Sequence, residues 1–277
     1  MIASVVPVHR KPRQLSLGMI GVGAFGAFAV KHLAPYFRVV GFDPVADLRP
    51  LAAKYGLHSA TLRDAASCDI VVLSMPVQML EKVVRDIAPH LRKGSIVLDV
   101  CSVKTEPAAI LAELPSHVQV IGTHPLFGPQ SGKAGIDGLP LAIVPIRGTA
   151  WRMVAAFLRS RLKLKVAVTT AEDHDRQMAY VQGLTHLISR ILLSMPSPTL
   201  SLTTTAFDHL KAMVDLLRRD SDDLFHAICA ENPFVHDVIR DFLDGTSTVG
   251  AQFYADDKPP ASPMETGLRM ISVAACP

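Results

Sequence analysis

"LSLGMIGVGAFGAFAVKHLAPYFRVVGFD", residues 15–43, decides the fold of this chain. A short apolar run leads into a glycine-rich turn at 21–26, a segment with helical spacing follows at 27–34, and a second apolar run at 38–42 ends before Asp43. Short apolar runs bounded by glycine are typical of buried strands, and apolar residues three and four positions apart are typical of a helix. The stretch therefore predicts a strand–turn–helix–strand unit.

The turn in this unit has the spacing Gly-x-Gly-x-x-Gly, which occurs by chance in many proteins but here follows a strand and opens a helix. Gly21 would allow the tight turn, Gly23 the approach of backbone N–H groups to a pyrophosphate, and Gly26 the close packing of helix on strand. We expect these glycines, with Ala24 and Phe25, to bind a dinucleotide. A glycine turn that binds nothing is the alternative.

Asp43 follows the second strand, 22 residues after Gly21. A carboxylate at this place accepts hydrogen bonds from an adenosine ribose and repels a 2′-phosphate, which favours NAD over NADP. Arg38 and Arg49 are close enough in sequence to admit NADP as an exception.

The alternation of strand and helix continues along the chain to about residue 170. We expect strands at 68–76, 94–102, 118–124, 138–145 and 165–170, and helices at 78–91, 106–114 and 151–162. Only helical patterns follow, at 172–195, 206–220 and 221–246, and Glu172 or Asp173 could cap the first of them. The pattern predicts an α/β fold, a Rossmann-type doubly wound and mostly parallel sheet over residues 1–168, followed by an all-α domain over 169–277.

Composition and charge exclude several classes of protein. Hydrophobic residues make up 49% of the 277-residue chain and the formal net charge is +3, so we expect a folded protein that does not bind nucleic acid. The four cysteines have no metal-ligand spacing, and we expect reduced thiols and no metal. The apolar runs are too short to span a membrane, and the start of the chain lacks the order of a secretory signal. We expect a cytoplasmic protein.

Polar residues follow the predicted strands, and in a doubly wound sheet ligands bind at the carboxyl ends of the strands. Ser74, Met75 and Pro76 end one strand and could line the cofactor groove or form an ordinary turn. Ser102 ends the next and could hold a substrate oxygen, or instead cap the following helix.

His124 ends the strand at 118–124 and is followed at once by a proline- and glycine-rich loop. Histidine titrates near neutral pH, which suits it to accept a proton from a hydroxyl during hydride transfer. A buried structural histidine is the alternative, but several strand ends converge here and favour catalysis. In the next domain, His186 has apolar neighbours and could be a core or a functional residue, and we expect His174 at the surface or in a first helical turn.

Taken together, these motifs resemble those of the prephenate/arogenate dehydrogenase family of tyrosine biosynthesis. The motifs that carry the resemblance span residues 17–195: "GVGAFG", "FDP", "LSMPV", "DVCSVKT", "GTHPLFGPQSG" and "EDHDRQMAYVQGLTHLIS". The variant "HPLFGPQSG" is most similar to plant-type arogenate dehydrogenases.

The resemblance implies an NAD(P)-dependent oxidative decarboxylation of arogenate or prephenate, in which a hydride passes from the ring C4 to the nicotinamide. It implies a helical domain that forms a homodimer, with the active site between the domains. His124 matches the family's catalytic histidine, and Ser102 matches the serine that shares the C4 hydroxyl. His186 matches a histidine near the substrate, and Ser131 lies in the loop over it.

One departure concerns the ring carboxylate of the substrate. Many members of the family bind it with an arginine, but residues 203–216 contain none, and Lys211 is the nearest cation there. Lysine offers a point charge in place of a bidentate fork. Gln130 and Asp137 are candidates for distinguishing the keto side chain of prephenate from the amine of arogenate.

Three alternatives remain open. The first, a β-hydroxyacid dehydrogenase, would need a catalytic lysine in the helical domain, and the chain has none between Lys165 and Lys211. The second is a homologue that binds NAD without catalysis. The third is a relative that acts on an amino-substituted prephenate.

Overall fold

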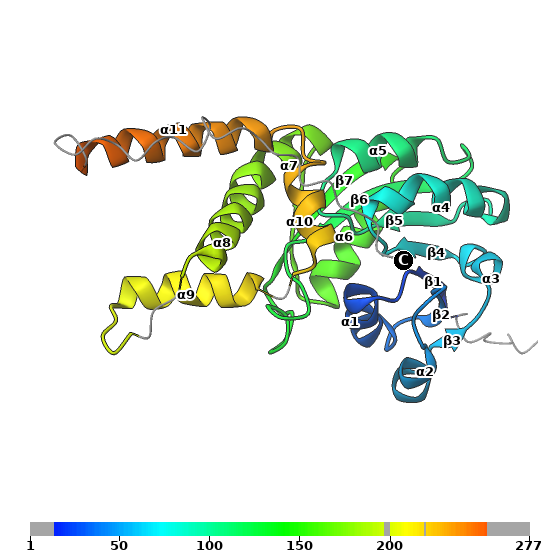
Figure 1. Ribbon diagram of the computed structural model, residues 1–277. Helices are drawn as coiled ribbons and strands as arrows, with labels where there is room; N and C mark the ends of the chain where they lie inside the picture. Colours follow the sequence, from blue (N-terminus) through cyan, green and yellow to red (C-terminus); the bar gives the residue numbers. More distant parts are fainter. Residues whose placement is uncertain (1–13, 197–199, 219, 254–277) are drawn as a thin grey trace, which may run out of the picture.

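The computed structural model describes residues 14–196, 200–218 and 220–253. Cys276 and the rest of the chain from residue 254 lie outside these ranges. The centre of the molecule is an eight-stranded sheet with the strand order β3-β2-β1-β4-β5-β6-β7-β8 (Figure 1). Its strands are β1 (Ser16–Ile20), β2 (Arg38–Phe42), β3 (His58–Ser59), β4 (Ile70–Leu73), β5 (Ile96–Asp99), β6 (Gln119–Pro125), β7 (Pro140–Arg147) and β8 (Lys165–Val168).

Strands β1 to β6 run parallel, which confirms the expected mostly parallel sheet. β7 runs antiparallel to β6, and β8 runs parallel to β7. The reversal has a simple cause: the segment between β6 and β7 contains no helix that could carry the chain back to the other end of the sheet.

Helices cover both faces of the sheet, because successive side chains of a strand point to opposite faces and are buried on both. In β4, Val71 and Leu73 pack in one apolar cluster, and Ile70 and Val72 pack in the other. The first cluster includes residues of α4 (Leu80–Ile87) and α5 (Thr105–Ala112), and the second includes residues of α1 (Ala24–Leu33) and α6 (Trp151–Ser160). The doubly wound arrangement is therefore confirmed.

The segment between β2 and β4 has three short elements that the sequence analysis did not identify: α2 (Arg49–Tyr55), β3 and α3 (Leu62–Ala66). Their signal is weak because β3 has only two residues, both exposed. The start of α3 does have a sequence signature, a capping box in which the Thr61 hydroxyl and the Asp64 side chain bond reciprocally.

Helices alone follow β8: α7 (Ala171–Met178), the π-helix η3 (Ala179–Leu184), α8 (Thr185–Ser194), α9 (Thr205–Leu217), α10 (Asp222–Cys229) and α11 (Val235–Phe253). The single helix expected over 172–195 is thus interrupted by a π-helical segment. The expected cap is also wrong: Thr170 caps α7, its hydroxyl accepting a hydrogen bond from Asp173 N. No helix in the described ranges is long and apolar enough to cross a membrane.

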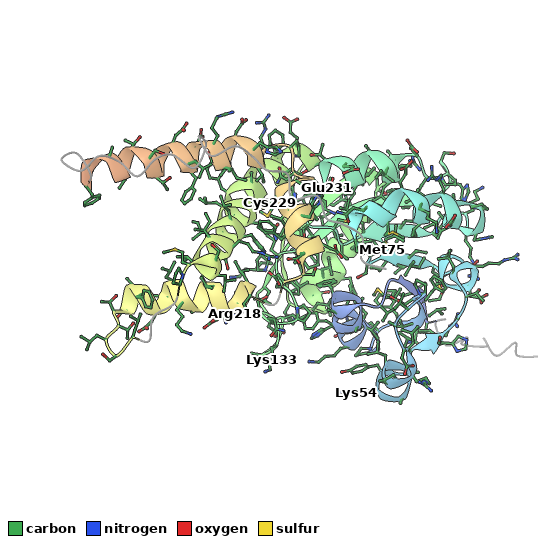
Figure 2. All side chains as sticks on the ribbon, viewed as in Figure 1. Lys54, Met75, Lys133, Arg218, Cys229 and Glu231 are labelled. Atoms are coloured by element: carbon green, nitrogen blue, oxygen red, sulfur yellow. The ribbon has the colours of Figure 1, made fainter. Side chains whose placement is uncertain are left out.

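The helices α8, α9 and α11 extend away from the sheet, whereas α7 and α10 lie against it (Figure 1). Figure 2 shows Met75, at the end of β4, and Glu231, just after α10, on either side of this boundary. Gln78 donates a hydrogen bond to Glu231 across it, at 3.2 Å. Ala227 of α10 belongs to the same apolar cluster that Met75 packs against.

Candidate active site

The glycine turn has the geometry that a dinucleotide needs. Gly21 has a φ of +87°, and a Cβ there would lie 2.2 Å from the carbonyl oxygen of Ser74. A Cβ on Gly26 would lie 2.3 Å from the carbonyl oxygen of Gly21, so both positions require glycine. Gly23 begins α1, and a Cβ there would meet nothing within 4 Å. The space above the α1 N-terminus can therefore receive a phosphate against free backbone N–H groups.

Asp43 lies beside this turn, at the end of β2. Its Oδ2 accepts a hydrogen bond from Val22 N at 2.7 Å, and its Oδ1 accepts from Val45 N at 2.9 Å and Ala46 N at 2.8 Å. Burial opposes ionisation, but the three N–H donors outweigh it and lower the pKa of this carboxyl. An ionised Asp43 is thus fixed where a ribose could bind it.

The two arginines that could admit NADP are placed differently. Arg38 opens β2 and lies five residues before Asp43, so roughly 16 Å of extended chain separates the two. Arg49 is exposed and forms a bidentate ion pair with Asp47, with an Nη2–Oδ2 distance of 2.8 Å. Arg38 therefore cannot reach the ribose site, and Arg49 is paired.

The residues after β4 border the glycine turn. Ser74 N donates a hydrogen bond to Ile20 O at 2.7 Å, and the Ser74 hydroxyl lies 3.3 Å from the place of a Cβ on Gly26. Met75 is half-buried, and Pro76 is exposed. The structure thus places Ser74 against the start of α1, on the side where the dinucleotide would lie.

His124 is the centre of a buried chain of hydrogen bonds. Its Nδ1 lies 2.9 Å from Nε2 of His174, and Nδ1 of His174 lies 2.7 Å from Oδ1 of Asp175. All three side chains are buried. The sequence analysis expected His174 at the surface or in a first turn: it is in the first turn of α7, but it faces β6 and is buried.

The chain of bonds determines where the protons are. Asp175 also accepts hydrogen bonds from Lys104 N at 2.8 Å and Thr105 N at 2.7 Å. Burial opposes the charge, but the bonds to His174, Thr105 and Lys104 lower the pKa of Asp175, so it is an ionised acceptor. When His174 is neutral, its Nδ1–H donates to Asp175 and its Nε2 is left as an acceptor. His124 Nδ1–H then donates to His174, and Nε2 of His124 carries the lone pair.

A buried ion pair lies next to this chain. Lys104 Nζ donates to Asp99 Oδ2, and both side chains are fully buried. Asp99 Oδ1 also accepts a hydrogen bond from Thr123 N at 3.3 Å. Burial first, and then the neighbouring His174 and Lys104, lower the pKa of His124 well below 6.5. His124 is therefore a neutral base at physiological pH.

Ser102 lies half-buried in the turn between β5 and α5. The alternative that it caps α5 is wrong, because Lys104 is the N-cap residue and contributes no side-chain bond. The carboxylate of Asp175 caps this helix instead, through the N–H groups of Lys104 and Thr105. Within the described ranges the Ser102 hydroxyl has no hydrogen-bond partner. It can therefore bind a ligand.

His186 lies in α8 and is buried. Its Nδ1 lies 2.9 Å from the carbonyl oxygen of Gln182, and its Nε2 lies 3.2 Å from Oδ2 of Asp220. Gln182, in η3, connects the two histidines, since its side-chain Nε2 lies 3.5 Å from Nε2 of His124.

The chain is similar to known dehydrogenases. Residues 27–139 match the family model "Prephenate dehydrogenase, nucleotide-binding domain". The chain is 28% identical over 241 residues to arogenate dehydrogenase 2 of Arabidopsis thaliana, covering 81% of this chain and 66% of that protein. It is 37% identical over 169 residues to a probable arogenate/prephenate dehydrogenase of Methanocaldococcus jannaschii, covering 56% of this chain and 37% of that protein. Residues 27–139 belong to the nucleotide-binding domain of the prephenate dehydrogenase family.

A solved structure shows the same fold. Prephenate dehydrogenase from Aquifex aeolicus superposes with a TM-score of 0.70 at 18% identity, over 88% of this chain and 93% of that one. The chain spans about two thirds of the length of the Arabidopsis relative and just over a third of the length of the Methanocaldococcus relative.

Three of the residues expected to contact the substrate, Gln130, Ser131 and Lys211, form no hydrogen bond with His124 within the described ranges. Gln130 and Ser131 are exposed in the loop after β6, where the Ser131 hydroxyl accepts a hydrogen bond from Gly128 N at 2.9 Å. Lys211 is exposed on α9 and pairs with Asp215 at 2.7 Å. The structure brings none of them into the hydrogen-bonded chain of His124, and Asp137 is also exposed.

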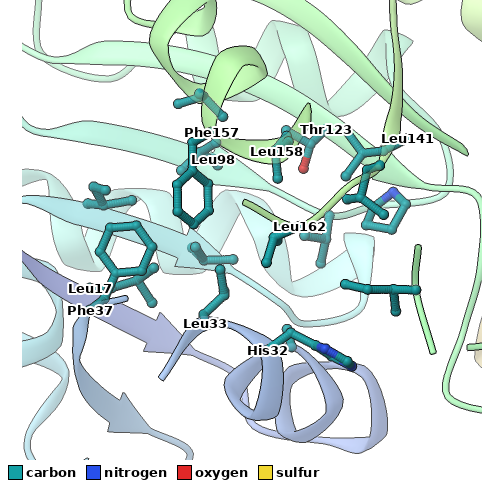
Figure 3. A pocket seen from close by; sticks show the side chains of 18 of the residues that line it. Leu17, His32, Leu33, Phe37, Leu98, Thr123, Leu141, Phe157, Leu158 and Leu162 are labelled. Atoms are coloured by element: carbon teal, nitrogen blue, oxygen red, sulfur yellow. The ribbon is translucent and has the colours of Figure 1, made fainter. Parts of the chain in front are cut away.

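A separate apolar cavity of about 220 Å³ lies on the opposite face of β6, between the sheet, α1 and α6 (Figure 3). Thr123 and Pro125 line it, whereas His124, between them in the strand, points to the face covered by α5 and α7. Its lining is almost entirely apolar, so it offers no site for a charged substrate.

The sequence analysis missed the roles of His174, Asp175 and Gln182. A signal was present: in the helical stretch from 172, His174, Asp175, Met178, Ala179 and Gln182 recur at spacings of one, three or four, as residues of one helix face do. Polar residues on the buried face of a helix need partners, and this pattern could have identified them.

Proposed function

We propose that this chain is a dehydrogenase that oxidatively decarboxylates arogenate or prephenate with NAD(P)⁺. The observation that carries the proposal is the buried hydrogen-bonded chain from Asp175 through His174 to His124. His124 ends a strand three positions from β1 in the sheet, roughly 14 Å from the glycine turn. A base and a dinucleotide turn at one edge of a sheet suit hydride transfer from a carbon that bears a hydroxyl.

The cofactor would lie across the carboxyl ends of β1, β2 and β4. The residues that would hold it are Gly21, Gly23, Ala24, Phe25, Gly26, Asp43, Ser74, Met75 and Pro76. When bound, its nicotinamide ring supplies the hydride acceptor. The position of Asp43, whose carboxylate would accept hydrogen bonds from the ribose and repel a 2′-phosphate, favours NAD⁺ over NADP⁺.

His124 would take the proton of the C4 hydroxyl on Nε2 as the hydride leaves C4. Ser102 would hold the same hydroxyl. His174 would accept a hydrogen bond from Nδ1–H of His124 throughout, and Asp175 would keep His174 in the required tautomer. The bond from the ring to its carboxylate then breaks, CO₂ leaves, and the electron pair of that bond makes the ring aromatic.

His186, Ser131, Gln130 and Lys211 are proposed to contact the rest of the substrate. For Lys211 this requires that its ammonium leave Asp215 for the ring carboxylate. The pair is exposed, and exposed ion pairs contribute less than about 1 kcal/mol, so the exchange is easily made.

We further propose that residues 1–168 and 169–277 form two domains, and that the helical one forms a homodimer. Helices α8, α9 and α11 expose large apolar side chains: Ile191, Leu193, Phe207, Leu210, Leu216, Leu243, Val249 and Phe253. A second copy of the chain would cover them. A reducing compartment such as the cytoplasm is proposed because Cys68, Cys101 and Cys229 are free thiols.

The decisive experiment measures absorbance at 340 nm with prephenate or arogenate, each with NAD⁺ or NADP⁺. We expect turnover with at least one pair, and more with NAD⁺ than with NADP⁺. His124→Asn should lower kcat about a hundredfold or more, because the base is lost, with NADH affinity unchanged. A protein that binds NADH but turns over none of the four pairs would refute the activity.

A further inference from the structure

Gln182 occupies an unusual position beside the proposed base. Its amide nitrogen lies 3.5 Å from Nε2 of His124, the atom that carries the lone pair. Its amide oxygen is buried and has no hydrogen-bond partner among the described residues. A buried amide oxygen without a partner is costly, and such atoms occur where function requires them.

The fold fixes the backbone of Gln182. The residue lies in η3, where the π-helical turn interrupts the register between α7 and α8. Its carbonyl oxygen accepts a hydrogen bond from Thr185 Oγ1 at 3.1 Å and lies 2.9 Å from Nδ1 of His186. The next residue, Gly183, lies so close to α11 that a Cβ would come within 2.8 Å of Val235. Only the side-chain amide of Gln182 is therefore free to turn.

The two ends of this amide suit the two protonation states of His124. An N–H group of the amide is the right partner for a lone pair on Nε2. Once the ring is protonated, Nε2–H needs an acceptor, and half a turn of the amide brings its oxygen to the same place. A hydrogen bond from a charged ring is the stronger of the two.

We propose that Gln182 is a positioning residue that follows the proton of His124, donating to the neutral ring and accepting from the protonated one. The inference rests on the proposed function for the source of that proton, the substrate hydroxyl. The pairing of amide and ring is a property of the free protein and can be measured without a substrate.

Several charged or titratable groups also face His124. They are His174 and Asp175 from α7, Lys104 from the turn before α5, and Asp99 from β5. Substitution of Gln182 leaves all four unchanged. A change in the titration of His124 in such a variant therefore reports on the amide.

The test is an NMR titration of the full-length protein with ¹⁵N-labelled histidine, in which the His124 signal is identified by its loss in His124→Asn. Gln182→Met removes both hydrogen bonds, and the pKa of His124 should fall by roughly half a unit because the charged ring loses the stronger bond. Gln182→Glu offers only an acceptor with a negative charge, and the pKa should rise by about one unit or more.

Gln177→Met is the matched control, because Gln177 is exposed on α7 and donates only to Asp173 O. Shifts in opposite directions for Gln182→Met and Gln182→Glu, with none for Gln177→Met, support the proposal. Shifts in the same direction, or none, overturn it. If His124 stays neutral at every pH at which the protein is folded, the ¹⁵N shift of its Nε2 still reports whether this atom accepts a hydrogen bond, and it should change in Gln182→Met and not in Gln177→Met; an unchanged shift in Gln182→Met overturns the proposal.

Activity separates this inference from the proposed function. In an active enzyme, Gln182→Met should lower kcat roughly threefold, the factor that half a pKa unit represents, with the KM for the dinucleotide unchanged. If no substrate is turned over but the titrations shift as expected, the function fails and the inference holds. If the enzyme is active but the titrations do not shift, the inference alone fails.

Discussion

At the scale of single residues, the site depends on contacts across long stretches of sequence. The glycine turn and Asp43 could be predicted because they lie within one strand–helix–strand unit, and His124 because it ends a strand. The spacing along α7 could have identified His174 as a polar residue on a buried helix face, but not as the partner of His124, since it is 50 residues away and meets His124 only when α7 packs on β6. Their pairing is a property of the folded chain.

Asp175 fixes the tautomer of His174 in the hydrogen-bonded chain His124–His174–Asp175. We therefore expect Asp175→Asn to impair both catalysis and stability. An amide can donate to a lone pair on Nδ1 of His174 or accept from Nδ1–H, so it no longer enforces one tautomer, and we expect kcat to fall by about 100-fold or more. The unfolding free energy at pH 7 should fall by about 2–4 kcal/mol, because two N–H groups of α5 lose a charged acceptor.

The pH dependence of stability provides the check. The pKa of Asp175 is lower in the folded protein than its usual 3.8, so its contribution is complete above pH 3.8 and is lost as pH falls through the folded value. Urea unfolding between pH 3 and 7 should therefore show a smaller acid loss in Asp175→Asn than in the wild type. An equal acid loss in both proteins would contradict this, and the exposed Asp223→Asn serves as control.

At the scale of elements, the regular strands and helices of the sheet region could be predicted, but the irregular ones could not. β3 has two exposed residues and no apolar pattern. The π-helix η3 has no signature of its own, since its sequence continues the helical spacing of α7. Its place between α7 and α8 is set by packing, above all by Gly183 against Val235 of α11.

The first turn of α7 carries both His174 and Asp175, so its cap should matter for catalysis. Thr170→Ala removes the bond from Asp173 N to the Thr170 hydroxyl, of 3.1 Å, and should lower stability by about 1 kcal/mol. Thr204→Ala is the matched control, because Thr204 caps α9 in the same way through Phe207 N. Both variants should lower Tm by similar amounts, but only Thr170→Ala should lower kcat. If kcat were the same in Thr170→Ala as in Thr204→Ala, fraying of the first turn of α7 would leave His174 in place and the prediction would be wrong.

At the scale of the whole molecule, the sheet and its covering helices form a unit whose apolar strands are buried on both faces. The projecting helices α8, α9 and α11 are not buried in this way. Leu210 of α9 and Leu243 of α11 are 36% and 50% exposed, and Phe253 at the end of α11 is 77% exposed. Exposed apolar side chains gathered on one set of helices indicate an interface.

A dimer that covers these helices should dissociate when charge is placed on them. We expect Leu210→Glu combined with Leu243→Glu to give a monomer in sedimentation velocity, because burial of unpaired carboxylates opposes association. Val45→Glu, at an exposed apolar residue in the loop after β2, should leave the dimer intact. A double variant that sediments as the wild-type dimer would place the interface elsewhere. If the monomer forms and still binds NADH, the cofactor site is complete within one chain, as its location on β1, β2 and β4 requires.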